Sequence, residues 1–198
     1  MPLPNLQTAA YADIEALPPN MVGEILFGSL VAHPRPVPGH IAATDYLGYE
    51  LGPPFSLGRG GPGGWVILSE PELHLGPHVV VPDMAGWRVE RLPAHQPRAW
   101  IDVAPDWVCE VLSPSTKSYD VGPKRRIYST YAVSHLWYID PTSKTLEVFH
   151  RQDNGSWNLT HTFVGHEDVC APPFEALTFS LTVLWRFDSP DADSKYEA

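Results

Sequence analysis

The chain has 198 residues, of which 43% are hydrophobic and 18% are charged, and its formal net charge is −10. This length and composition fit one globular domain better than two, and we expect a single domain over residues 1–188 with a disordered tail over residues 189–198. The negative charge argues against binding of nucleic acid by overall electrostatic attraction, because neutralisation of phosphates supplies most non-specific affinity. A nucleic-acid substrate would need a local basic patch or bound cations.

Membrane and metal-thiol classes are also disfavoured. The chain has no run near the roughly 18 to 20 apolar residues of a membrane helix, and its N-terminus lacks the regions of a signal peptide, so we expect a cytoplasmic protein with no membrane contact. The only cysteines are Cys109 and Cys170, and the nine histidines show no HxH or HExxH spacing. We therefore expect two reduced thiols and neither a disulfide framework nor a zinc site.

The N-terminal part of the chain predicts a short helix followed by a hairpin. Thr8 can cap a helix that ends at Leu17, because two prolines follow. From Met21 to Ala32, apolar residues alternate with others around a glycine, which predicts a β-hairpin. Glu24 would share a face with two apolar neighbours, although a surface position on an edge strand fits its parity equally well.

Beyond residue 38 the pattern predicts an α/β (α+β) domain. Residues 39–57 have the apolar spacing of an amphipathic helix, and a second helix is expected from Pro123 to Ala132, with proline in its first turn. Short apolar and alternating runs predict strands over residues 64–69, 72–75, 78–82, 106–112, 136–139 and 145–150. A last hairpin is expected around residues 153–155, and the sheet should be mixed or mostly antiparallel.

Two carboxylates stand where carboxylates are costly. Asp83 follows the apolar run 79–82 and would project from the rim of the sheet into a cleft, while Glu110 sits inside the apolar run 107–112. A carboxylate in such a strand is unfavourable unless it is paired, protonated or bound to a cation. Since Mg²⁺ and Mn²⁺ prefer oxygen ligands at about 2.1 Å, the pair predicts a divalent-metal site with Asp83 and Glu110 as ligands.

Lys124 is the candidate for a positive group beside this pair. It opens the predicted helix, and Tyr128 and Tyr131 follow at i+4 and i+7, so this face is expected to pack toward the sheet. A lysine that faces inward among aromatics needs an acidic partner, which Asp83 and Glu110 would supply. Such a lysine could orient an attacking water and stabilise charge on a phosphodiester.

Each of these residues also has a structural interpretation. Asp83, in a Pro-Asp dipeptide, could simply terminate a strand, and Glu110 could belong to a structural ion pair. Lys124 and the two arginines after it could form a solvated basic face. We further expect Asp120 to cap a helix or orient the lysine, and His40 to approach the site from the helix expected over residues 39–57.

Several short motifs follow one another between residues 10 and 187: Glu24 to Val31, Glu70 to Gly76, Pro82-Asp83, Glu110 to Thr116, Asp120, Lys124 and Trp137 to Pro141. In this order they resemble the Uma2 (DUF820) family of restriction-endonuclease-like proteins. The resemblance implies a PD-(D/E)xK nuclease core in αβββαβ order, with a mixed β-sheet flanked by helices and extra β-hairpins. It also implies an acidic set of Glu24, Asp83 and Glu110, with Lys124 as a displaced lysine.

Two positions depart from that pattern. The general motif has a lysine two residues after the second acid, where this chain has Leu112, so the lysine role must move to Lys124 or be lost. The hairpin has Phe27-Gly28 where the family commonly has Asp-Gly, which weakens the turn signal without touching the site.

We therefore expect a Mg²⁺- or Mn²⁺-dependent endonuclease that hydrolyses DNA phosphodiester bonds, with Glu24 assisting at a second metal or through hydrogen bonds. A homodimer is expected because many proteins of this fold pair by twofold symmetry. Two alternatives stay open. One is a catalytically inactive binding module, favoured by the −10 charge and by Leu112. The other is a metal-dependent hydrolase of another phosphorylated substrate.

Overall fold

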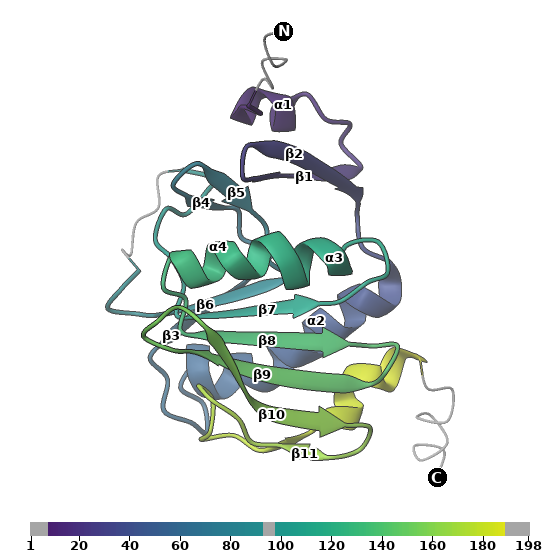
Figure 1. Ribbon diagram of the computed structural model, residues 1–198. Coiled ribbons are helices and arrows are strands. Elements are labelled where there is room, and N and C mark those ends of the chain that lie inside the picture. The colour runs from purple at the N-terminus through teal and green to yellow at the C-terminus, as the bar shows by residue number, and fades with distance from the viewer. Residues whose placement is uncertain (1–7, 93–97, 189–198) are drawn as a thin grey trace, which may run out of the picture.

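The computed structural model describes residues 8–92 and 98–188, and a six-stranded sheet lies at its centre (Figure 1). In sheet order the strands are β10 (Trp157–Val164), β9 (Thr145–Arg151), β8 (His135–Asp140), β7 (Trp107–Val111), β6 (Met84–Arg88) and β3 (Trp65–Ser69). The β7–β8 pair is parallel, and the other neighbouring pairs of this sheet are antiparallel. The prediction of a mixed, mostly antiparallel sheet is confirmed.

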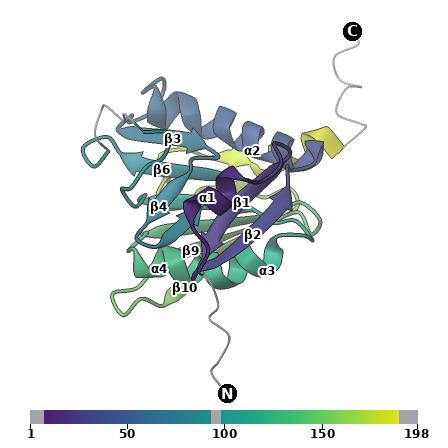
Figure 2. The same ribbon diagram turned by 90° about the horizontal axis from the view of Figure 1, so that it is seen from above.

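The helices form two layers on opposite faces of this sheet, as the view from above shows (Figure 2). One layer contains α2 (Pro38–Leu51), continued by a π-helical turn over Gly52–Ser56, and the 3-10 helix η3 (Leu181–Asp188). The other contains three consecutive helical segments, α3 (Lys117–Tyr119), η2 (Asp120–Lys124) and α4 (Arg125–Thr130). No helix in residues 8–92 and 98–188 is long and apolar enough to cross a membrane.

The side chains of β7 alternate between these two layers. Cys109 and Val111 are buried in the core on the α2 side, whereas Val108 and Leu112 are buried in the core on the α4 side. Successive side chains of a strand point to opposite faces. Glu110 therefore faces the layer that contains α4.

A second, smaller sheet lies beside the first one, toward the N-terminus (Figure 1). Its strands, in order, are β2 (Ser29–Pro34), β1 (Met21–Leu26), β5 (His78–Val80) and β4 (Leu73–Leu75), and the short helix α1 (Tyr11–Glu15) contacts β1. β1 and β2 form the predicted hairpin, and Phe27 and Gly28 at its turn both have positive φ, 52° and 80°. Such a turn matches the twist of the two strands.

Glu24 is buried on β1, with an exposed fraction of 1%. β1 pairs with β2 on one side and with β5 on the other, so it is an interior strand of its sheet. The alternative of a surface position on an edge strand is therefore wrong.

Strand β6 was not expected from the sequence, and its glycine explains why. Gly86 carries no apolar side chain that would extend a β-pattern, yet a Cβ there would lie 3.1 Å from the Trp107 ring and 3.3 Å from the Trp65 ring. The close packing of two tryptophans at this position therefore favours glycine. The strand is defined by its pairing with β3 and β7, which is not local in sequence.

Other element boundaries also differ from the predictions. The helix expected to begin at Pro123 begins at Lys117, and Pro123 lies within the π-helical turn, an irregular segment where the regular backbone ladder is already altered. Helix α1 is shorter than predicted, and Asp13 rather than Thr8 accepts a hydrogen bond at its N-terminus, from the N–H of Ala10. The two-stranded sheet of β11 (Asp168–Val169) and β12 (Phe179–Ser180) was not expected either. The predicted tail over residues 189–198 lies outside the described residues.

Candidate active site

Asp83 and Glu110 lie across from each other at one end of the central sheet. Asp83 directly precedes β6, and the pairing of Met84 with Cys109 brings it opposite Glu110. The N–H of Val111 donates to Asp83 Oδ2 at 2.6 Å. The two acids singled out in the sequence are thus brought together by strand register.

His40 reaches Asp83 from α2, as expected from the sequence. Its Nε2 lies 2.7 Å from Asp83 Oδ1, and both side chains are largely buried. With Val111 on one oxygen and His40 on the other, the Asp83 carboxylate is held in one orientation.

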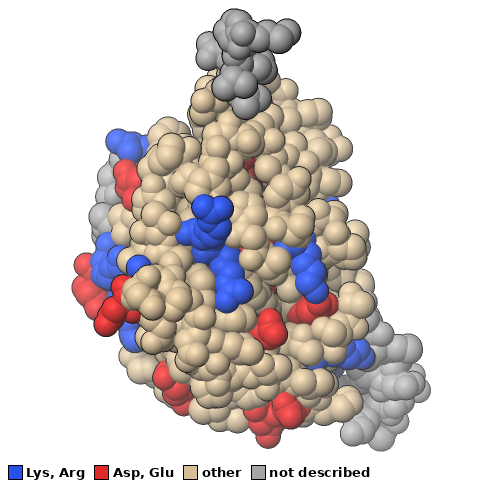
Figure 3. Space-filling model, in the orientation of Figure 1, with Lys and Arg blue, Asp and Glu red and all other residues tan. Residues whose placement is uncertain are grey.

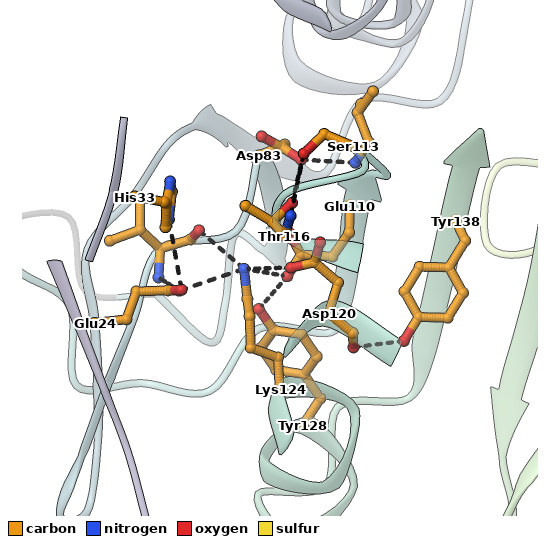
Figure 4. A network of polar contacts seen from close by, with 12 residues as sticks. Glu24, His33, Asp83, Glu110, Ser113, Thr116, Asp120, Lys124, Tyr128 and Tyr138 are labelled. Carbon is orange, nitrogen blue, oxygen red and sulfur yellow. Dashed lines mark hydrogen bonds and ion pairs between the residues drawn. The ribbon is translucent and has the colours of Figure 1, made fainter. Parts of the chain in front are cut away.

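The Lys124 ammonium is the centre of a buried polar network (Figure 4). Its Nζ lies 2.8 Å from Glu110 Oε1, 3.3 Å from Glu24 Oε1 and 3.2 Å from Asp120 Oδ1, and it donates to the carbonyl of Val81 at 3.2 Å. These four oxygens lie within 3.3 Å of Nζ, three as carboxylate partners and the Val81 carbonyl as a hydrogen-bond acceptor. The charge of Lys124 is thus balanced inside the network.

This network corrects two expectations about Lys124. Its exposed fraction is 3%, so the interpretation as a solvated basic face is wrong for this residue. Its acidic partners are Glu110, Glu24 and Asp120, and within the described residues it forms no ion pair with Asp83. Burial lowers the pKa of Lys124, but Glu110 and Glu24 outweigh burial and hold this pKa well above its ordinary value. The ammonium therefore stays charged.

Glu24 joins the network from the small sheet. Its Oε1 accepts the N–H of Val81 at 2.7 Å, and its Oε2 lies 3.8 Å from His33 Nε2. Burial raises the pKa of Glu24, but the Lys124 charge, the nearby His33 ring and the hydrogen bond from Val81 outweigh it and hold the pKa below its ordinary value. Glu24 thus remains an ionised carboxylate in the interior.

Glu110 has one engaged oxygen and one available oxygen. Its Oε1 takes both the ammonium of Lys124 and a hydrogen bond from the Tyr128 hydroxyl, at 2.5 Å. Among the described residues its Oε2 has no hydrogen-bond partner. Burial raises the pKa of Glu110 well above its ordinary value, Lys124 opposes this, and the charges of Asp120 and Asp83 raise the pKa further. The cluster has more carboxylates than cations and is short of positive charge.

Asp120 stands one helical turn before Lys124, where it can orient the ammonium. Burial raises the pKa of Asp120, and the Lys124 charge opposes this. The hydroxyl of Tyr138 donates to the Asp120 carbonyl at 2.9 Å, which ties η2 to β8. The network therefore joins both sheets to the helical layer of α4.

Two adjoining cavities open onto these groups. The first has a volume of about 310 Å³, and its wall includes Asp83, Glu110, Asp120 and Lys124, along with Ser113. The second has a volume of about 200 Å³. The residues common to both walls are Arg35, Pro36, His40, Glu70 and Asp83. Asp83 and His40 thus stand where the two cavities meet.

The carboxylates of Asp83 and Glu110 fit a hard divalent cation in their chemistry. Both line the larger cavity, and carboxylate oxygens are preferred ligands of Mg²⁺. Within residues 8–92 and 98–188, no group of three His, Cys, Asp or Glu side chains is arranged to hold a metal ion. Mg²⁺ commonly takes one or two carboxylates and completes its shell with waters and substrate phosphate oxygens, so two protein ligands are sufficient for such a site.

Sequence reasoning missed part of this network. His33 and the backbone of Val81 belong to the network because the hairpin contacts the end of β5. No local sequence pattern predicts that contact. For Tyr128 a signal existed, because it lies one turn after Lys124 on the same helical face. Tyr131, expected on that face, packs against the same core as Tyr128 and lies edge-on to His78, with ring centroids 6.1 Å apart.

Comparison with known proteins identifies the family. The model of the Uma2 family, described as "Putative restriction endonuclease", matches residues 10–183. The chain belongs to the Uma2 family. This membership confirms the resemblance found in the sequence, and the family description supports a nuclease-like function.

Two known proteins are similar to this Uma2 chain, one in structure and one in sequence. The crystal structure of "a putative nuclease belonging to DUF820" from Anabaena variabilis has a TM-score of 0.65 and 22% sequence identity, over 84% of this chain and 90% of that one. At this identity the likeness shows the fold, which confirms the predicted α/β architecture. The "Uncharacterized protein slr1290" of Synechocystis sp. is 39% identical over 83 residues, which is 41% of this chain and 43% of that protein. The match thus spans less than half of either protein.

Proposed function

We propose that this Uma2 protein is a divalent-metal-dependent endonuclease that hydrolyses DNA phosphodiester bonds. The observation that carries the proposal is the position of Asp83 and Glu110 on the wall of one cavity, beside the buried charge of Lys124. Family membership adds support, since the Uma2 description names restriction endonucleases.

In this proposal Asp83 and Glu110 hold Mg²⁺ or Mn²⁺. The bound ion would supply Lewis-acid activation and would neutralise negative charge on the phosphate. The protein contributes two carboxylates in fixed orientations. Val111 and His40 hold Asp83, while Lys124 and Tyr128 hold Oε1 of Glu110 and leave Oε2 for the cation.

Lys124 acts chiefly through the carboxylates it contacts. Its charge keeps Glu24 ionised and holds Glu110 in place. Lys124 also lines the larger cavity, but its three carboxylate partners already balance its charge. Glu24 supports the site by orienting the ammonium from β1.

A second candidate function is a binding module that keeps the nuclease fold without catalysis. The burial of Lys124 among three carboxylates favours it, because such a lysine serves equally well as a purely structural ion-pair partner. This candidate predicts neither metal-dependent cleavage nor stabilisation by metal.

Cleavage assays separate these candidates. Wild-type protein, Asp83→Asn, Glu110→Gln and Lys124→Ala would be incubated with supercoiled, linear and single-stranded DNA in Mg²⁺ or Mn²⁺, with EDTA as a control. The exposed Glu90, which lines neither cavity, supplies the matched variant Glu90→Gln.

The nuclease proposal predicts cleavage by the wild type and by Glu90→Gln, and its loss in the three site variants. Equal background in all proteins would reject it and favour the binding module. Metal binding without DNA cleavage would instead favour hydrolysis of another phosphorylated substrate. We also propose a homodimer, and sedimentation equilibrium tests it by giving either one or two chain masses.

A further inference from the structure

The site has a strongly negative wall and, among the described residues, one Lys or Arg without an ion-pair partner. The larger cavity is lined by Lys124, whose charge is balanced by three carboxylates, and by one other Lys or Arg, Arg35. Against these stand four carboxylates, those of Glu70, Asp83, Glu110 and Asp120. Each phosphodiester carries a negative charge, so this wall repels a nucleic-acid backbone unless a further positive group meets it.

The overall charge and the face that carries α4 offer little compensation. The chain carries a net charge of −10, and on the face that carries α4 the Lys and Arg side chains form small separate groups rather than one broad basic surface (Figure 3). A cation inside the site therefore has more influence on substrate binding than its single charge suggests, because field lines concentrate in a cleft with low-dielectric walls.

Among the described residues, the Arg35 side chain has no polar or aromatic partner, whereas most other basic side chains have one. Ion pairs, carbonyl contacts or aromatic rings engage the side chains of Arg88, Arg91, Arg98, Lys117, Arg125, Arg126 and Arg151. Within residues 8–92 and 98–188, the basic side chains without a polar or aromatic partner are those of Arg35, Arg59, Lys144 and Arg186. Of these four, only Arg35 lines a cavity of the site.

The backbone of Arg35 is anchored while its side chain is exposed. It lies between the end of β2 and the start of α2, with Pro34 and Pro36 on either side, and proline restricts both its own backbone and that of the preceding residue. Its N–H donates to the carbonyl of Asn20 at 3.3 Å. The guanidinium therefore starts from a defined point at the junction of the two cavities, beside Asp83 and His40.

We propose that Arg35 binds a phosphate of the substrate backbone at this junction, next to the phosphate that is cleaved. This inference rests on the proposed nuclease function. A guanidinium presents paired N–H donors that match two phosphate oxygens. Because phosphates carry no sequence information, the contact positions the strand without reading its bases.

The test compares Arg35→Gln and Arg35→Lys with the wild type and with Arg59→Gln. Arg59 is an equally exposed arginine without a side-chain partner in the described residues, and it lines neither cavity. Two readouts are needed. The first is kcat and KM for DNA cleavage in Mg²⁺, and the second is equilibrium binding of two fluorescent duplexes of unrelated sequence in Ca²⁺ over a range of salt concentrations. Thermal unfolding verifies that every variant is folded.

Loss of a charge-assisted phosphate contact should weaken binding of both duplexes and raise KM by about tenfold, with a smaller change in kcat. The slope of log K against log salt should fall by about 0.9 in Arg35→Gln. Arg35→Lys should recover part of the affinity, because lysine keeps the charge without the paired donors. Arg59→Gln should match the wild type.

The outcomes distinguish this inference from the nuclease proposal. Cleavage by the wild type with unchanged KM, affinity and salt slope in Arg35→Gln would overturn the role of Arg35 and leave the nuclease in place. Binding without cleavage, weakened in Arg35→Gln alone, would support the phosphate contact and reject the nuclease. A wild type that neither binds nor cleaves DNA would overturn both.

Discussion

Lys124 and Glu110 form a 2.8 Å ion pair whose members have exposed fractions of only 3% and 1%. Removing two charges from water is costly, and the cost is met only where geometry is good and further hydrogen bonds satisfy both groups. Here Tyr128 donates to one oxygen of Glu110, while Glu24 and Asp120 add further negative charge beside Lys124. The stability of the site therefore depends on the whole network rather than on any one contact.

Replacement of Lys124 by methionine should lower the free energy of unfolding by about 3 to 5 kcal/mol, because the buried carboxylates lose their cation. Adding Glu110→Gln to Lys124→Met should cost much less than Glu110→Gln costs in the wild type, since the charge it removes is no longer compensated. Urea unfolding of the wild type, both single variants and the double variant measures this coupling. Additive effects would mean that the pair is not energetically linked.

Tyr128 and Tyr138 offer a matched comparison of two buried hydroxyls. Tyr128 donates to the Glu110 carboxylate, whereas Tyr138 donates to the backbone carbonyl of Asp120. A hydrogen bond to a charged group contributes about 1.5 to 3 kcal/mol and one to a neutral group about 1 kcal/mol. Tyr128→Phe should therefore destabilise the protein more and should reduce nuclease activity more than Tyr138→Phe. Equal losses in urea unfolding and in cleavage would contradict a specific role for the Tyr128 hydroxyl.

The pair of acids could be predicted from the sequence because each stands in or next to an apolar strand, where an unpaired carboxylate is costly. Lys124 could be predicted because helical spacing puts it on the same helix face as Tyr128. Strand β6 could not be predicted, since Gly86 is favoured by tertiary packing between Trp65 and Trp107 and adds nothing to a local β-pattern. The direct partners of Lys124 were also only partly predictable.

Glu24 shows most clearly what local sequence patterns cannot predict. Its parity fitted a buried and an exposed position equally, and the pairing of β1 with β5 decides between them. That pairing joins segments more than fifty residues apart, as does the hydrogen bond from Val81 to Glu24. Local propensity carries no information about such contacts, whereas a family resemblance carries it indirectly.

A metal site at Asp83 and Glu110 should stabilise the folded chain. Mg²⁺ or Mn²⁺ at one hundred times its dissociation constant would add about 2.7 kcal/mol to the free energy of unfolding, because it binds only the folded state. The melting temperature should rise with metal concentration in the wild type and in Glu90→Gln, and it should not rise in Asp83→Asn. An equal rise in all three proteins would place the ion elsewhere.

His33 gives the fold a pH dependence of known sign. The Glu24 carboxylate, 3.8 Å from Nε2 of His33, raises the pKa of His33 above its ordinary value, although burial opposes this. A histidine with a raised pKa in the folded state stabilises that state fully below the unfolded pKa of about 6.5, and the stabilisation is lost as pH rises through the folded pKa. His33→Gln should therefore destabilise the protein more at a pH of about 6 than at a pH of about 9. Urea unfolding at both values tests this, with the exposed His166→Gln as a control that should change stability little. If His33→Gln lowered the free energy of unfolding by the same amount at both pH values, His33 would contribute packing rather than charge.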